Sequence, residues 1–511
     1  MLSPSWSVGI DETDYFDLTT TSPISITATI VDPPAEWLRE ETFGLLQSGW
    51  STNAELHDEP QPGDIGALTV RFTVADDNEP SWHVIAEHHP NEKVISAKQR
   101  ALGNATRIDT IDRQLTWGNG TLLTKATAEP EHASATLAQA TKAAREAFRA
   151  EDHPQLTATA TKLQTTAQQY AVRPRSTFTA ALDSKGMQLR AGCLALHDAA
   201  VPARLFGLGT RRILTIALQE ILTDTPGIAL IDEFEHGLEP HRIRRLLRKF
   251  GTLTGIQTFM TTHSPVVVHE LAPTALCIVR SNDHTTTVQT VPEEHLRKTI
   301  RAVPESLLAR RLLVCEGATE VGLIRALDDH WATTSQPIAS LGAIPLDGEG
   351  STAPKRAREL RLLNYDVMVF GDSDRDIATS ATALRAEGIP VTIWDGTICT
   401  EQRLINDLPW EGVRALLALV LEDRDQQSIR NQVKEQLPTN SGLDLSPPVM
   451  EWQDSPELRD VLGRTAGKSG WYKQLHLGEA VGKIVAQHLA TIATTNTGIV
   501  LETLRVWLHR D

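Results

Sequence analysis

The sequence predicts a mixed α/β protein with two domains, and two observations indicate this. Apolar runs that end in acidic residues recur at 312–315 and 367–371, with helical patterns between them. Short apolar runs bounded by glycine and turn formers are typical of buried strands in a parallel sheet. The chain also has 511 residues, which is more than one hydrophobic core usually holds. We therefore expect one domain at 1–292 and a second at 305–511.

The composition is that of a folded protein without a membrane span. The hydrophobic fraction is 41% and the charged fraction 22%. No apolar stretch approaches the roughly 20 residues that cross a bilayer, and the N-terminus has no signal pattern. We expect a cytoplasmic protein, with Cys277 and Cys315 as buried thiols in apolar runs. The formal charge of −16 argues against general coating of nucleic acid but allows a local basic groove.

The first domain is expected to begin with an antiparallel sheet and to carry a helical hairpin. Residues 25–31 and 67–74 alternate apolar and polar side chains, as half-buried antiparallel strands do. Residues 131–171 have helical spacing with a break at Pro154. After the break, a heptad seam consists of Leu156, Ala160, Leu163, Ala167 and Tyr170. The seam fits a packed surface hairpin as well as it fits a dimerisation arm.

Five residues of the first domain are candidates for binding nucleotide. Asp232 and Glu233 end the apolar strand pattern 227–231, and such a pair can hold the Mg²⁺ shell and orient the attacking water. His263 ends the next strand pattern and is placed to sense the γ-phosphate. Gly207 and Gly209 open a helix, whose N-terminus can bind a phosphate.

In order and spacing these residues resemble the ABC-type ATPases of the chromosome-maintenance and recombination group. The resemblance makes 207–210 the signature loop, Asp232 and Glu233 the Walker B pair, and His263 the switch histidine. The sequence contains no Gly-x-x-x-x-Gly-Lys-Ser/Thr phosphate loop, and residues 463–469 are one residue too short between glycines and follow no strand. We expect one of three explanations. The true start of the protein lies further upstream, another polypeptide supplies the phosphate loop, or the ATPase has been reduced to a scaffold.

The acidic residues of the second domain stand at the ends of predicted strands. Glu316 follows the first strand and Glu320 lies on the next helix, while Asp372, Asp374 and Glu401 follow later strands. Ligands of open α/β sheets bind beyond the carboxyl ends of the strands. Clustered carboxylates need a cation, and oxygen ligands suit Mg²⁺ or Mn²⁺. The pattern predicts metal-dependent phosphate chemistry.

Other charged residues of this domain have plainer interpretations. Asp347 and Asp376 fit solvated turns. Arg356, Arg358 and Arg361 lie on one predicted helix, where they could contact a DNA backbone. A salt-bridged helix face explains them better.

The second domain resembles the Toprim domain, and the whole chain resembles the OLD (overcoming lysogenisation defect) family of ATPase-Toprim nucleases. The motifs are Glu-Gly-x-x-Glu at 316–320, Asp-x-Asp at 372–374, the later Glu401, and Lys473 before a Gly-Glu helix. The resemblance implies that metals are held by Glu316, Glu320, Asp372, Asp374 and Glu401. It also implies that Lys473, Glu316 and Asp372 are catalytic, with Lys473 neutralising the scissile phosphate, and that 410–469 is a helical insertion.

Three functions remain as expectations. The first is a Mg²⁺- or Mn²⁺-dependent DNA endonuclease or nickase, a homodimer regulated by ATP and acting against phage or mobile DNA. The second is a non-catalytic DNA-binding or scaffold subunit that needs a partner ATPase, because the phosphate loop is missing. A topoisomerase or primase comes last, because no tyrosine lies in a winged-helix context and the cysteines form no zinc module.

Overall fold

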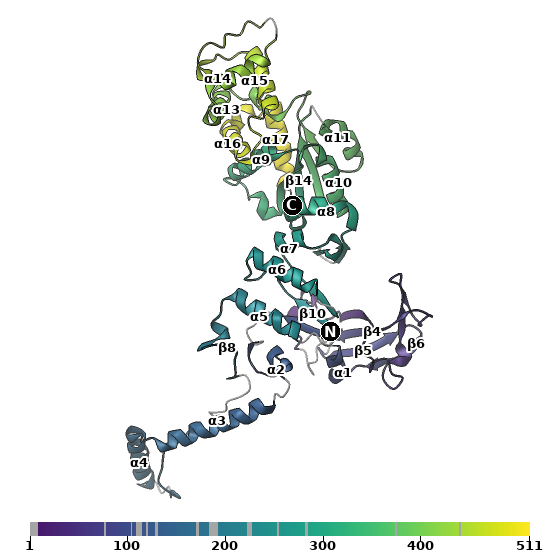
Figure 1. The fold of residues 1–511 in the computed structure, drawn as a ribbon, viewed down its shortest axis with the longest axis vertical. Helices are drawn as coiled ribbons and strands as arrows, with labels where there is room; N and C mark the ends of the chain where they lie inside the picture. The colour runs from purple at the N-terminus through teal and green to yellow at the C-terminus, as the bar shows by residue number, and fades with distance from the viewer. Residues whose placement is uncertain are drawn as a thin grey trace. The chain divides into compact units, whose positions relative to one another are not determined.

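The computed structural model describes most of the chain as two compact units, Met1–His263 and Ser264–Asp511 (Figure 1). The residues described are 9–75, 78–103, 105–108, 115–118, 121–127, 131–169, 173–182, 193–221, 227–252, 255–281, 285–373, 376–438 and 441–510. Both units mix helices and strands, which confirms the predicted class. Within these residues, no helix combines the length and apolar character that a bilayer crossing requires.

The first unit begins with an antiparallel sheet. Strands β1 (Ile24–Val31) and β4 (Ile65–Val74) pair antiparallel over their length, which confirms the period-two prediction. The sheet order is β3-β2-β4-β5-β6, with β1 also beside β4. Its other strands are β2 (Ser48–Trp50), β3 (Leu56–His57), β5 (Pro80–Ala86) and β6 (His89–Val94). Aromatic side chains fill its core, and they include Trp37, Phe43, Phe72 and Trp82.

A separate parallel sheet of the first unit positions the nucleotide candidates. Its order is β11-β10-β7, from β7 (Ala105–Ile108), β10 (Gly227–Ile231) and β11 (Ile256–Met260). Helix α5 (Leu208–Ile221) precedes β10, and α6 (Pro240–Phe250) connects β10 to β11. Other short elements of this unit are α1 (Ala97–Leu102), α2 (Leu122–Ala126), β8 (His197–Asp198) and β9 (Val201–Pro202).

The region of the predicted hairpin forms two helices, α3 (Glu131–Ala150) and α4 (Pro154–Gln169). In the described residues the two helices do not pack along each other's length, as a hairpin would require. Proline is tolerated in the first turn of a helix, so Pro154 begins α4. On the heptad seam, Leu156 is 48% and Leu163 60% exposed. Tyr170 lies outside the described residues. The two leucines of the seam therefore face solvent in this single chain, whereas Ala160 and Ala167 are partly buried.

The second unit contains a parallel four-stranded sheet of order β15-β14-β16-β17. Its strands are β14 (Arg311–Cys315), β15 (Ala343–Asp347), β16 (Asp366–Gly371) and β17 (Val391–Ile393). Helices α9 (Ala318–Trp331) and α16 (Leu475–Ile492) pack on one face, and α10 (Ala353–Leu362) and α11 (Asp376–Ala386) on the other (Figure 1). Coverage on both faces explains why β14 and β16 are apolar after their first residues, Arg311 and Asp366.

Helices complete the C-terminal part, and they make up much of the region 410–469. The helices are α12 (Thr400–Asp407), α13 (Trp410–Asp423), α14 (Gln426–Glu435), α15 (Pro456–Ser469) and α17 (Asn496–Leu508). Close packing of α9 on α16 depends on glycine, because a Cβ on Gly322 would overlap the carbonyl oxygen of Leu475. A Cβ on Gly478 would likewise overlap the carbonyl oxygen of Thr319.

The unit boundary lies earlier than the predicted boundary at 292. The segment after His263 forms α7 (Pro265–Glu270), β12 (Cys277–Ser281), β13 (Thr286–Thr290) and α8 (Glu293–Ala302). Val268 and Val291 of this segment share a core with Leu312 and Val314 of β14, so it packs with the second unit. Cys315 is buried as predicted, but the prediction for Cys277 was wrong. Cys277 is exposed because β12 and β13 form a separate two-stranded sheet.

Candidate active site

Glu316 and Asp372 are brought together by two adjacent parallel strands. Cys315 at the end of β14 pairs with Phe370 of β16, and the Glu316 amide donates to the Phe370 carbonyl at 2.8 Å. The amide of Asp372 donates to Oε2 of Glu316 at 2.8 Å. A Cβ on Gly371 would lie 2.8 Å from this Oε2, so the approach requires a residue without a side chain. The two candidate ligands therefore occupy one corner of the sheet edge.

Glu320 lies on the first turn of α9 and points back toward this corner. Its side chain is 5% exposed, and Oε2 accepts a hydrogen bond from the amide of Gly317 at 3.0 Å. Burial, together with the charges of Glu401 and Glu316, raises the pKa of Glu320 to about 7. Glu320 is thus a buried carboxylate with two acidic neighbours.

Thr400 holds Asp372 in place. Oδ1 of Asp372 accepts hydrogen bonds from the amide of Thr400 at 2.6 Å and from its hydroxyl at 2.7 Å. Thr400 is fully buried at the start of α12, directly before Glu401. Burial, followed by the charges of Glu320, Glu316 and Glu401, raises the pKa of Asp372 to about 9. We did not single out Thr400 from the sequence, and its only sign there is its place before Glu401.

Glu401 completes a group of four carboxylates from four elements. It is 4% exposed on the first turn of α12. Its charge acts on Glu320 and Asp372, and it also helps burial to raise the pKa of the Cys399 thiol and of the Tyr472 phenol. The acidic residues predicted to share a site, so far as they are described, therefore do lie within reach of one another's charge.

Lys473 lies in the loop between α15 and α16, and its side chain is exposed. The hydroxyl of Thr319, the neighbour of Glu320, donates to the carbonyl of Tyr472 at 3.0 Å. This bond fixes the backbone beside Lys473 against the first turn of α9. The backbone of Lys473 thus adjoins a residue that is bonded to the first turn of α9, while its side chain is exposed.

Several other predicted residues do not join this group in the described structure. Asp374 and the side chain of Asp376 lie outside the described residues. Asp347 is a turn residue, with Oδ1 accepting from the amide of Glu349 at 2.8 Å. The buried Arg356 donates to the Asp347 carbonyl and lies 3.3 Å from Glu349. On the same helix, Arg358 pairs with Glu387 at 2.7 Å, and Arg361 is exposed. Arg356 and Arg358 thus follow the salt-bridge interpretation.

The carboxylate group fits a divalent cation in its chemistry. Oxygen donors suit Mg²⁺ and Mn²⁺, and a cation would offset the burial and repulsion that raise the pKa of Asp372 and Glu320. In the described part of the chain, no three His, Cys, Asp or Glu side chains are arranged so that they could hold a metal ion directly. Oε2 of Glu316 and Oδ1 of Asp372 instead accept hydrogen bonds from protein donors.

Asp232 and Glu233 follow β10 and are fixed by β11. The hydroxyl of Thr261 donates to Oδ1 of Asp232 at 2.6 Å and accepts from the amide of Glu233 at 2.8 Å. Glu233 has a φ of 45°, a left-handed conformation that a non-glycine residue seldom adopts. The buried Arg212 of α5 donates to the carbonyls of Asp232 and Glu233, the latter at 3.1 Å. Both carboxylates are exposed on this rigid turn.

Gly209 lies against the same turn, whereas Gly207 is open. A Cβ on Gly209 would overlap the carbonyl oxygen of Gly237, but a Cβ on Gly207 would meet nothing within 4 Å. His263 is exposed, and its amide donates to Oε1 of Glu235 at 2.6 Å. The five nucleotide candidates thus lie around one end of the β10–β11 sheet.

The sequence 463–469 lies within α15, which agrees with its rejection as a phosphate loop. The described tyrosines also have structural partners. The hydroxyl of the buried Tyr472 donates to the Leu416 carbonyl at 3.0 Å, and that of Tyr365 donates to the Leu307 carbonyl at 2.8 Å. Tyr15 donates to Asn78 at 2.7 Å. These hydrogen bonds give no support to a tyrosine nucleophile among these three.

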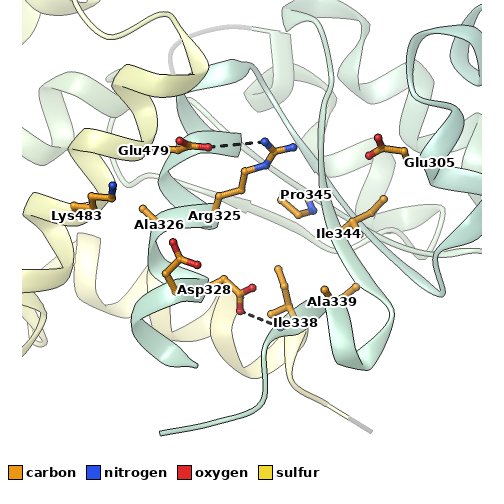
Figure 2. Close-up of a pocket in the computed structure, with 12 residues that line it drawn as sticks. Glu305, Arg325, Ala326, Asp328, Ile338, Ala339, Ile344, Pro345, Glu479 and Lys483 are labelled. Atoms are coloured by element: carbon orange, nitrogen blue, oxygen red, sulfur yellow. Dashed lines mark hydrogen bonds and ion pairs between the residues drawn. The ribbon is translucent and has the colours of Figure 1, made fainter. Parts of the chain in front are cut away.

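A cavity of about 380 Å³ in the second unit lies apart from the carboxylate group (Figure 2). Its walls come from α9, α16 and β15, and its apolar floor includes Ala326, Ile338 and Ile344. Arg325 and Glu479 on its rim are 3.8 Å apart. None of the predicted ligands that the structure describes lines this cavity, so the carboxylate site and the cavity do not coincide.

Residues 115–269 match the family described as "AAA domain, putative AbiEii toxin, Type IV TA system". The match spans α5, β10, α6 and β11, and it includes all five nucleotide candidates. The chain therefore contains an AAA-type ATPase domain. A search of curated proteins gave no match.

Proposed function

We propose that this chain is a divalent-metal-dependent DNA endonuclease or nickase of the OLD type, regulated by nucleotide at its AAA-type domain. The observation that carries the proposal is the approach of Glu316, Glu320, Asp372 and Glu401 within one unit. Burying four carboxylates together costs stability, and strongly raised pKa values are typical of functional sites. The parallel sheet beneath them supports the Toprim interpretation.

Each residue has a chemical role in this proposal. Glu316, Glu320, Asp372 and Glu401 would hold Mg²⁺ or Mn²⁺, with Asp374 as a further ligand. When bound, the metal supplies a Lewis acid for the phosphate and lowers the pKa of a bound water. Thr400 orients Asp372 through two hydrogen bonds. Lys473 would neutralise the charge that builds up on the scissile phosphate.

Plasmid nicking in the presence of Mn²⁺ tests the proposal. We expect the wild type to nick supercoiled DNA and the double variant Glu316→Ala, Asp372→Ala to lose this activity. Glu422→Ala changes an exposed acidic residue of α13 and is the matched control. Equal nicking by the wild type and the double variant would contradict the proposal.

A second candidate is a non-catalytic DNA-binding or scaffold subunit that depends on a partner ATPase. It is favoured by the missing phosphate-loop motif and by the protein hydrogen bonds on the site carboxylates. A protein that only binds DNA should keep its affinity in EDTA and should never cleave. Electrophoretic mobility shifts with and without EDTA distinguish it from the nuclease.

The wider role follows by analogy. ABC-type heads bind nucleotide between two subunits, so we propose a homodimer, with a partner protein as the alternative source of the phosphate loop. The matched family's description names a putative toxin of a Type IV toxin–antitoxin system. From this we propose a cytoplasmic protein that acts on DNA in defence against phage or mobile elements.

A further inference from the structure

Glu235 lies two residues beyond Glu233 and has no counterpart among the residues predicted from the sequence. It is half-buried in the turn after β10. Its Oε2 accepts a hydrogen bond from the hydroxyl of Thr262 at 2.7 Å, and its Oε1 accepts one from the amide of His263 at 2.6 Å. One carboxylate therefore binds two successive residues at the end of the β11 segment. Such charge-assisted hydrogen bonds are stronger than neutral ones.

The bonds of Glu235 extend a continuous series between the two strand ends. The amide of Thr261 donates to the Ile231 carbonyl, and the amide of Phe234 donates to the Thr261 carbonyl, both at 3.0 Å. The Thr261 hydroxyl bonds Asp232 and Glu233. Every residue from Ile231 to Glu235 is thus hydrogen-bonded to the segment 261–263. A displacement of His263 must therefore break these hydrogen bonds or move the residues that they join.

The position of His263 in the chain gives the series its importance. His263 is the last residue of the first unit, and α7 begins at Pro265 in the second. The backbone that Glu235 holds is therefore the backbone that leads out of the nucleotide-binding unit.

We infer that Glu235 is a positioning residue that holds His263 beside Asp232 and Glu233 and couples the nucleotide state to the segment entering the second unit. The inference rests on the proposed nucleotide site, because His263 has this role only if a phosphate reaches it. Glu235 itself accepts hydrogen bonds from protein donors through both oxygens, so it acts through His263.

Amide hydrogen exchange of the full chain, followed by mass spectrometry, tests this directly. The peptides of interest cover 258–266 and 265–272, with and without ATP and Mg²⁺. Without nucleotide, Glu235→Ala should speed exchange of the His263 amide by about tenfold or more, the usual worth of a hydrogen bond to a charged group. Glu235→Gln should retain slow exchange, because its carbonyl oxygen accepts from His263 and its amide can donate to the Thr262 hydroxyl.

The control is Glu239→Ala, which removes an exposed glutamate of the same turn that pairs with Arg242 at 3.1 Å. It should exchange like the wild type. If Glu235→Ala does not fold, Thr262→Val removes one of the two bonds and should give an intermediate rate. With ATP, we expect slower exchange in both peptides for the wild type and Glu235→Gln, and no change for Glu235→Ala.

The outcomes separate the inference from the proposed function. An exchange rate of the His263 amide equal to that of the wild type in Glu235→Ala, or in Thr262→Val if that variant replaces it, would overturn the positioning role. An ATP response in Glu235→Ala equal to that of the wild type would overturn the coupling. If ATP changed the exchange of none of the proteins, the proposed nucleotide site would be contradicted. The comparison without nucleotide would still decide whether Glu235 positions the loop.

Discussion

The backbone amide of Asp372 donates a 2.8 Å hydrogen bond to the carboxylate of Glu316, although 56 residues separate the two in the chain. The bond exists because β14 and β16 are adjacent and parallel, so their carboxyl ends meet at one edge. Gly371 lets the two backbones approach. This relationship places two predicted metal ligands at one point and underlies the predictions that follow.

The metal-free protein should lose stability as the pH rises. Asp372 has a pKa of about 9 when folded against an ordinary 3.8, and Glu320 about 7 against 4.5. The folded state therefore keeps protons that the unfolded state releases, and the free energy of unfolding falls from about pH 4 to about pH 9. Thermal melts in EDTA measure this. A melting temperature that rises steadily across the same range would show that these carboxyls are ordinary.

Glu320→Gln should stabilise the metal-free protein at pH 8, because it removes a buried charge beside Glu401 and Glu316. Each kcal/mol gained raises the melting temperature by roughly 2–4 °C in a domain of this size. The same variant should lose the stabilisation that Mn²⁺ gives the wild type. A melting temperature that Mn²⁺ raises equally in both proteins would exclude Glu320 as a ligand.

Thr400→Val should reduce metal-dependent cleavage by about tenfold, because one of the two hydrogen bonds that orient Asp372 is lost. It should also destabilise the protein, since the indole of Trp394 donates to the same hydroxyl at 2.8 Å. Thr400→Ser keeps the hydroxyl and is the control. The cleavage rates of both variants are measured at one fixed metal concentration. A serine variant as slow as the valine variant would show that the hydrogen bond of the hydroxyl is not responsible for the loss.

Lys473→Met should lower cleavage by about a hundredfold while leaving stability and Mn²⁺ affinity unchanged. The side chain is exposed, so its removal leaves no buried group unpaired. Lys468→Met alters another exposed lysine nearby in sequence, on α15, and should cleave normally. Single-turnover rates with saturating Mn²⁺ are the appropriate measurement. Similar losses in both variants would indicate a general effect of charge on DNA binding.

Gly322→Ala should destabilise the second unit by roughly 1–3 kcal/mol, because the added Cβ overlaps the backbone of α16 at Leu475. The shift would also move the Lys473 loop relative to Glu320. Gly442→Ala is the control, since a Cβ there meets nothing within 4 Å. Urea unfolding curves measure both variants, and an unchanged midpoint for Gly322→Ala would contradict the close helix packing.

The sequence predicted the elements that carry the site better than the bonds within it. Apolar runs identify β14 and β16, because both faces of their sheet are covered. Thr400 and Glu235 could not be found this way. Each acts through hydrogen bonds to a distant segment, and local spacing carries no record of such contacts.

The boundary after His263 was missed for a related reason. Residues 264–292 have ordinary strand and helix patterns, and nothing in them shows which unit their apolar side chains join. Only the packing of Val268 and Val291 against β14 decides it. Cys277 is exposed for the same cause, because an apolar run in a two-stranded sheet leaves one face open.

Calorimetric titration of the full chain with Mn²⁺ tests the central claim most directly, because it asks whether the gathered carboxylates bind a cation before any DNA is added. We expect saturable binding by the wild type and by Glu422→Gln, and an affinity at least tenfold weaker in Glu316→Gln, Asp372→Asn. Equal affinity in the wild type and the double variant would show that the cation binds elsewhere, and the proposed reaction centre would be wrong.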